Sequence, residues 1–166
     1  MPDFRRQKIR TIAQDLKDVE FPFMWLDPEY CWHSGFVYWE RKLRDVIRQI
    51  ARAKFHNRYL DALRDVSQRL AHVELVPYHS SAFSAHSIID DLPSVHAARR
   101  FVREMLASSG GNKTFILTRA RAQWALPIEP ENLVIYQGSL TRGASLGSNS
   151  SGGQANLKHY GIRGTN

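Results

Sequence analysis

The chain has 166 residues, of which 43% are hydrophobic and 11% aromatic, so it can bury a core and does not have the composition of a disordered chain. Its one cysteine, Cys31, excludes a disulfide framework, a zinc ribbon and a four-cysteine iron–sulfur cluster. The formal net charge of +7 indicates a polyanionic partner, most often nucleic acid, although a basic surface kept for solubility would give the same balance.

The sequence also bears on location and assembly. The basic start, MPDFRRQKIR, is followed by no apolar signal stretch, and no apolar run approaches membrane-spanning length. Together with the single cysteine, this predicts a cytoplasmic protein without membrane contact. We expect one domain over residues 1–166 and a monomer.

The N-terminal half is predicted to be helical around an irregular aromatic segment. Apolar residues near helical spacing predict a helix over residues 2–16. Residues 19–30, VEFPFMWLDPEY, contain two prolines and predict an irregular segment laid over the core, with Phe21 to Trp25 as a short extended piece. Two longer helices are expected over residues 36–54 and 56–70, and in the first of them the basic residues lie mostly opposite the apolar face.

The second half of the chain is predicted to contain three strands. Val73 to Val76 is the first strand, and it ends at Pro77 because proline cannot donate to a sheet ladder. Continuous apolar strands that alternate with helices are typical of an α/β fold with a parallel sheet. We therefore expect a three-layer α/β sandwich, with three parallel strands between helices. After Pro77 we expect a helix over 93–107, a strand over 113–118, a short turn or helix over 119–125, a strand over 132–136 and a helix over 154–160.

Polar residues follow each predicted strand. Right-handed crossovers would place the carboxyl ends of the strands at one edge of the sheet, where open α/β sheets bind their ligands. A histidine can transfer a proton, an aromatic ring can stack on a base, arginines bind phosphate, and a loop of small residues lets a backbone approach closely. The pattern therefore predicts a nucleotide-binding edge. The residues are Tyr78, His79 and Ser80 after the first strand, Arg121 and Trp124 after the second, and Gln137 and Ser139 after the third.

Several of these residues also fit a structural role. Tyr78 could be a tyrosine at the core edge, and His79 could cap a turn instead of contacting a base. For Arg121 and Trp124, a structural role is favoured over contact with a ligand. The run 143–153, GASLGSNSSGG, could be a mobile loop, but its length within a compact domain favours binding.

Several enzyme classes lack their motifs in this sequence. There is no Walker loop, no GxGxxG and no GxSxG, which argues against an NTPase, a dehydrogenase and a serine hydrolase. Cys31 and the histidines His33, His79 and His86 have no recognised metal-ligand spacing, so we expect no metal and no other cofactor. His33 lies in a predicted loop and is a further candidate for the nucleotide-binding edge.

Six stretches, taken in order, resemble the uracil-DNA glycosylase superfamily, in particular its bacterial branch. They cover most of the chain, and VELVPYHS is the best single match. The resemblance implies a small parallel sheet between helices and hydrolysis of the bond between a base and deoxyribose, after the nucleotide has been flipped out of the duplex. The stretches are FPFMWLDPEY, YWERKL, VELVPYHSSAFS, LPSVHAARRFVREML, FILTRARAQW and SLGSNSSGG.

The resemblance also assigns roles to residues. It implies that Tyr78, His79 and Ser80 lie on the wall that reads the base, with His79 taking part in catalysis. Asn149 lies in the motif that inserts at the minor groove and stabilises the departing base. We add His33 and Trp124 as base-binding candidates. The candidates for phosphate binding are Arg121, Arg142, Ser145, Ser148 and Ser150.

This sequence departs from the family pattern at two places. The family's first motif supplies the residue that activates water, and no apolar strand that could carry it precedes Phe4. Asp27 and Glu29, in a predicted turn around Pro28, are the available substitutes, and we select Asp27. SLGSNSS replaces the histidine-proline-serine form of the second motif, which argues against plain uracil excision. A shortened site with a missing wall would be more open, and we expect it to admit a bulkier base.

We therefore expect a DNA glycosylase for a modified or damaged base, with DNA as its partner and defence against phage that carry modified DNA as one role. A non-catalytic nucleic-acid-binding protein stays open as the alternative, because the water-activating motif is missing. A hydrolase of free nucleotides that uses the same edge is a third possibility.

Overall fold

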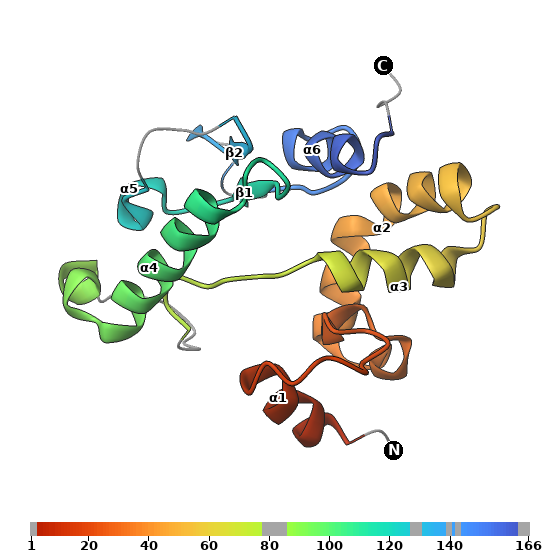
Figure 1. The fold of residues 1–166 in the computed structure, drawn as a ribbon, viewed down its shortest axis with the longest axis horizontal. Coiled ribbons are helices and arrows are strands. Elements are labelled where there is room, and N and C mark those ends of the chain that lie inside the picture. Colours follow the sequence, from red (N-terminus) through yellow and green to blue (C-terminus); the bar gives the residue numbers. More distant parts are fainter. Residues whose placement is uncertain (1–2, 78–85, 127–130, 139–140, 142–143, 163–166) are drawn as a thin grey trace. The chain divides into compact units, whose positions relative to one another are not determined.

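The computed structural model describes residues 3–77, 86–126, 131–138, 141 and 144–162 (Figure 1). The chain divides into two compact units, which we describe separately: unit 1 is Met1–Ala71 with Ser145–Asn166, and unit 2 is His72–Ala144. The interpretation of residues 1–166 as a single domain stays a prediction. With η for a short 3₁₀ helix, the elements are α1 (Phe4–Ile12), η1 (Met24–Leu26), η2 (Pro28–Tyr30), α2 (Ser34–Lys54), α3 (Tyr59–Arg69), η3 (His86–Asp91), α4 (Pro93–Ser108), β1 (Phe115–Leu117), α5 (Arg121–Trp124), β2 (Leu133–Ile135) and α6 (Ser151–His159).

Helix α2 is the central element of unit 1. Its apolar residues recur at a helical spacing of three and four, so they form one continuous apolar face. That face is almost fully buried, and α2 contacts α3, α6 and η1. Figure 1 shows α2 and α3 running side by side. The buried residues of the face are Leu43, Val46, Ile47 and Ile50.

The aromatic segment before α2 is anchored to α3 by a buried serine. Ser67 is 1% exposed, and its hydroxyl accepts a hydrogen bond from the Phe23 backbone N–H at 3.0 Å. The segment does not form the extended piece predicted over Phe21 to Trp25. It turns into the 3₁₀ helix η1, which buries Met24 and Leu26. Phe21 and Met24 are both buried, and an extended piece would place these two side chains on opposite faces.

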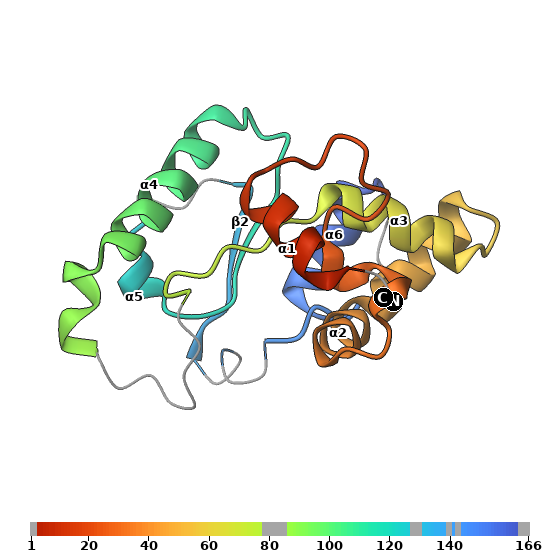
Figure 2. The ribbon, with the colours of Figure 1, turned by 90° about the horizontal axis from the view of Figure 1, so that it is seen from below.

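Unit 2 contains a sheet of two parallel strands with helix α4 beside it (Figure 2). Phe115 pairs with Leu133 and Leu117 with Ile135. The core of the unit joins β1, α4, α5 and η3, and the segment before residue 78 contributes one side chain. Its buried members are Leu75, Ile89, Val95, Leu117 and Trp124.

The first predicted strand does not form, and the prediction of a three-stranded sheet is wrong for the described residues. Residues 73–76 have no ladder partner, although Leu75 is buried and Val73 and Val76 pack against the same core. A short apolar run is buried equally well as irregular chain, so hydrophobicity alone did not require pairing. The fold is α/β in the broad sense: helix-rich, with a small two-stranded parallel sheet flanked by helices.

Within the described part of the chain, no helix is both long and apolar enough to cross a membrane. The helices that the sequence predicts after residue 30 are found within a few residues of the expected ends. Helix α6 begins at Ser151, inside the glycine- and serine-rich run that the sequence predicts to be a loop.

If α2 is the centre of unit 1, truncation of a side chain on its buried face should lower the free energy of unfolding far more than truncation of one on its exposed face. Ile47 is 0% exposed and Val37 is 51% exposed on the same helix. We expect Ile47→Ala to lower the free energy of unfolding by about 2–5 kcal/mol. The matched control Val37→Ala should stay within about 0.5 kcal/mol of the unchanged protein in urea unfolding followed by circular dichroism. Equal losses for the two variants would contradict this assignment of the core.

Candidate functional site

The loop over residues 145–150 is held by its own serines. The Ser150 hydroxyl caps α6: it accepts from the Gly153 backbone N–H at 3.1 Å and donates to the Gly147 carbonyl at 2.7 Å. The Ser145 hydroxyl accepts from the Gly147 backbone N–H at 3.1 Å. Hydrogen bonds at both ends therefore fix the path of the backbone through this loop.

A close backbone approach also fixes the loop against α6. A Cβ atom at Gly153 would lie 1.9 Å from the Gly147 carbonyl oxygen, so only glycine fits there. Ser148 is 9% exposed, and its carbonyl accepts from the Gln154 side-chain amide at 2.5 Å. The second half of the glycine- and serine-rich run is thus a packed turn followed by the first turn of a helix.

Asn149 is exposed on this turn. Among the described residues, no hydrogen bond partner is found for its side-chain amide, in contrast to the serine hydroxyls at positions 145 and 150. An amide on a fixed backbone can donate a hydrogen bond to a bound group with little ordering cost. Asn149 is therefore the residue of this loop that is best placed to contact a ligand.

The predicted phosphate-binding serines differ in exposure. Ser145 is exposed, whereas Ser148 is buried and Ser150 uses its hydroxyl within the loop. Contact between the Ser150 hydroxyl and a phosphate would break the hydrogen bond from the Gly153 N–H that caps α6. Their role in phosphate binding stays a prediction.

Asp27 caps the short helix η2. Its carboxylate accepts from the Glu29 backbone N–H at 2.9 Å, and the side chain is half-buried. Burial raises the pKa of the Asp27 carboxyl above its ordinary value, the Glu29 N–H opposes the rise, and the nearby carboxylates of Glu29 and Glu20 add to it. A raised pKa makes a carboxylate a better proton acceptor, as activation of water requires.

His33 caps helix α2 from within an aromatic cluster. Its Nδ1 accepts from the Gly35 backbone N–H at 2.9 Å. The ring stacks on Phe4 with centroids 4.9 Å apart, and the Trp25 ring lies 5.0 Å away. A Cβ atom at Gly35 would lie 2.4 Å from the Trp25 ring, so a glycine is needed for this close packing. The ring is partly exposed, and base contact by His33 stays a prediction.

The predicted residues of unit 2 lie on or beside α5. Trp124 is 7% exposed and belongs to the core of the unit, while Arg121 is exposed at the first position of α5. Tyr78, His79 and Ser80, together with Arg142, lie outside the described residues. The convergence of the predicted strand ends on one pocket therefore stays a prediction. Of the predicted site residues, the structure brings together those of the 145–150 loop.

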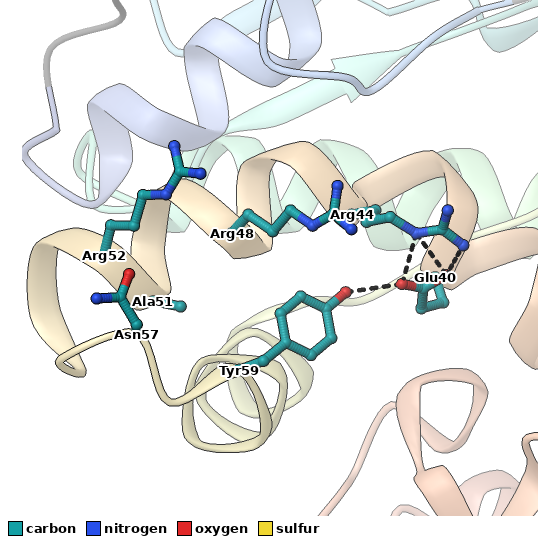
Figure 3. A pocket seen from close by; sticks show the side chains of 7 residues that line it. All are labelled: Glu40, Arg44, Arg48, Ala51, Arg52, Asn57 and Tyr59. Carbon is teal, nitrogen blue, oxygen red and sulfur yellow. Dashed lines mark hydrogen bonds and ion pairs between the residues drawn. The ribbon is translucent and has the colours of Figure 1, made fainter.

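Sequence analysis missed a basic hollow of about 420 Å³ in unit 1 (Figure 3). The Glu40 carboxylate accepts from the Arg44 guanidinium at 2.6 Å and from the Tyr59 hydroxyl at 2.8 Å. These residues, with others of α2 and the start of α3, line what we call the α2–α3 hollow. The lining residues are Glu40, Arg44, Arg48, Ala51, Arg52, Asn57 and Tyr59.

The electrostatics of the hollow are set by Glu40. Hydrogen bonds from Arg44 hold the pKa of the Glu40 carboxyl below its ordinary value, and burial opposes this in part. Burial, and then the hydrogen bond to Glu40, raises the pKa of the Tyr59 hydroxyl. At neutral pH the hollow therefore has one carboxylate against three guanidinium groups. The recurrence of arginine every four residues was the pattern that could have revealed it.

No family model matches the chain, and comparisons with curated proteins and with solved structures find no match. The resemblance to uracil-DNA glycosylases therefore stays a prediction from the six stretches of sequence. The described residues contain no cluster of three or more side chains suited to hold a metal ion.

The pKa shift of Asp27 predicts a gain in stability when its charge is removed. Because the folded protein holds the proton more tightly than the unfolded chain, the charged carboxylate destabilises the fold above the folded pKa, and this cost fades as the pH falls toward the ordinary value of 3.8. Asp27→Asn keeps an oxygen for the cap, so it should raise the free energy of unfolding at pH 7. In urea unfolding, the gain should shrink as the pH is lowered toward 3.8 and be lost below it. A variant that is less stable at pH 7 would contradict this assignment.

The packing of the 145–150 loop predicts a large difference between two neighbouring positions of α6. Gly153→Ala must displace the Gly147 carbonyl, and we expect it to lower the free energy of unfolding by about 1–3 kcal/mol. Ser151 is exposed one residue after the cap, so Ser151→Ala should change stability by less than about 0.5 kcal/mol. Thermal unfolding of the two variants measures the difference. If Gly153→Ala is as stable as the control, the loop is not packed as described.

Proposed function

We propose that this protein is a DNA glycosylase that hydrolyses the N-glycosidic bond of a modified or damaged base flipped out of DNA, leaving an abasic site. It acts as a monomer in the cytoplasm, and defence against phage with modified DNA is one role that this activity would serve. A glycosylase-like sandwich, with helices on both faces of the small sheet, is part of the same proposal.

One observation carries the proposal. The stretch that resembles the family's second motif, SLGSNSSGG, folds into a loop with a fixed backbone that leaves the Asn149 amide exposed. Further support comes from the net charge of +7, which suits a partner with a phosphate backbone. The ordered resemblance of the other stretches adds the reaction type.

In the proposed reaction, the bond between the base nitrogen and C1′ of the sugar breaks with its electron pair going to the base. The sugar becomes oxocarbenium-like, and the oxygen of a water molecule bonds to C1′. Asn149 and His79 donate hydrogen bonds to the departing base anion. Asp27 accepts the proton of the water and later releases it to solvent, and the departing base anion takes up one proton from solvent, so the products are the neutral base and the abasic sugar.

The remaining candidates bind the substrate in this proposal. Tyr78, Ser80 and His33 contact the flipped base in this proposal, whereas base contact by Trp124 would require its ring to leave the core of unit 2. The phosphates are held by Arg121 and by the candidates of the glycine- and serine-rich run. Those candidates are Arg142, Ser145, Ser148 and Ser150. A shortened site that lacks the wall of the first motif favours a base bulkier than uracil.

The proposal is tested by scoring abasic sites on DNA that contains uracil, a deaminated purine or a bulky modified pyrimidine. We expect cleavage of the bulky base to be fastest. Asn149→Ala should lower the rate by about 10²–10³ without a change in the unfolding temperature, because it removes a donor to the developing charge. Ser151→Ala, next to the same loop, is the matched control and should keep full activity. No abasic sites on any of the three substrates, with a folded protein, would refute the enzymatic proposal.

A second candidate function is non-catalytic binding of nucleic acid. It is favoured by the structural use of two predicted site residues, since Asp27 caps η2 and His33 caps α2. It predicts salt-sensitive affinity for DNA without abasic sites even at high protein concentration.

A further inference from the structure

We propose that the α2–α3 hollow binds the phosphodiester backbone of DNA through Arg44, Arg48 and Arg52, which we call the arginine stripe. The inference rests on the proposed function only for the identity of the partner. It adds a binding surface in unit 1, separate from the residues that would contact the base. The ligand chemistry is a row of phosphate oxyanions.

The spacing of the arginine stripe suits an extended polyanion. Its members are four residues apart on α2, so they lie on one face with a rise of about 6 Å between neighbours. The stripe spans about 12 Å, which corresponds to about three to four nucleotide steps of one DNA strand at about 3.4 Å each along the helix axis. Figure 3 shows the three side chains in a row along the helix.

The three arginines differ in how strongly they pair with carboxylates of the protein. The Arg44 guanidinium donates hydrogen bonds to both carboxylate oxygens of Glu40, which hold it in place. Its remaining N–H groups can therefore be presented in a fixed direction. Arg48 is 58% exposed and lies at 4.0 Å from the Asp45 carboxylate, a contact worth little in water. Among the described carboxylates, none forms an ion pair with Arg52. Donors are therefore left for a ligand.

A basic face that serves only solubility would not account for this arrangement. Two exposed arginines of unit 1 outside the hollow have close carboxylate partners: Arg58 lies 2.7 Å from Asp61, and Arg69 lies 3.1 Å from Asp65. The stripe instead sets three guanidinium groups around a hollow that contains one carboxylate, and Glu40 is already bonded to Arg44 and Tyr59. Three cations that share a concave surface repel one another unless an anion enters.

The inference is tested by fluorescence anisotropy of a short labelled DNA duplex with the full chain, at several salt concentrations. Arg48→Ala/Arg52→Ala should weaken binding on the order of tenfold and lower the salt slope by about 2, one for each lost phosphate contact. Arg48→Lys/Arg52→Lys keeps both charges and should recover most of the affinity. The matched control Arg5→Ala/Arg6→Ala removes the same charge from exposed positions of α1 and should change the affinity by less than about twofold.

The outcomes separate this inference from the proposed function. Equal losses for the stripe variant and the α1 control would overturn the stripe as a site and leave DNA as the partner. Competition by inorganic phosphate at a concentration that leaves ionic strength unchanged would also overturn it, because it would indicate a site for a single anion. A loss confined to the stripe variant, in a protein that forms no abasic sites, would support the stripe while refuting the glycosylase.

Discussion

Burial of one face of α2 is the constraint on which unit 1 depends. A helix of this length that stood alone would be marginal in water, and its stability comes from packing of its apolar face. Each fully buried Leu, Ile or Val side chain contributes about 1.5–3 kcal/mol, whereas a surface ion pair contributes about 0–1 kcal/mol. The orientation of α2 is therefore set by Leu43, Val46, Ile47 and Ile50 and not by its charges.

The same constraint determines where the cations of the helix lie. Because a helix has 3.6 residues per turn, burial of its apolar face fixes the directions in which all its remaining side chains point. Arg44, Arg48 and Arg52 then follow one another at the side of the helix, next to Tyr59 of α3. The charged surface is thus a consequence of core packing.

The 145–150 loop depends on a second close contact. Gly153 lets the backbone of α6 approach the Gly147 carbonyl, and the Ser150 hydroxyl accepts from the Gly153 N–H, one of the N–H groups that the helix start leaves open. Helix α6 in turn contacts α2. In this way the loop that carries Asn149 is attached to the central helix of the unit.

Some of this could be predicted from the sequence. Long periodic stretches gave α2, α3 and α4 because their apolar spacing has one physical explanation. Residues 73–76 do not form a strand, because a short apolar run does not specify which strand it would pair with in a sheet. The run 143–153 looked flexible by composition, but Ser150 and Gly153 fit a helix start that only the neighbouring backbone reveals.

The candidate site was harder to predict, because its contacts too depend on neighbouring backbone that the sequence does not reveal. Caps such as Asp27 and His33 each depend on one hydrogen bond whose geometry comes from the fold, so their residue type alone suggests catalysis as readily as structure. The arginine stripe was visible as a spacing, but its meaning required the position of Glu40 and Tyr59.

The most direct measurement is an NMR titration of the full chain with a DNA duplex that contains a bulky modified base, observed at backbone amides and arginine side chains. We expect the largest shifts at Arg48 and Arg52 and in the 145–150 loop, with Asn149 among them. The absence of shifts at both the arginine stripe and this loop, at saturating DNA, would contradict the assignment of these two parts of unit 1 to DNA binding.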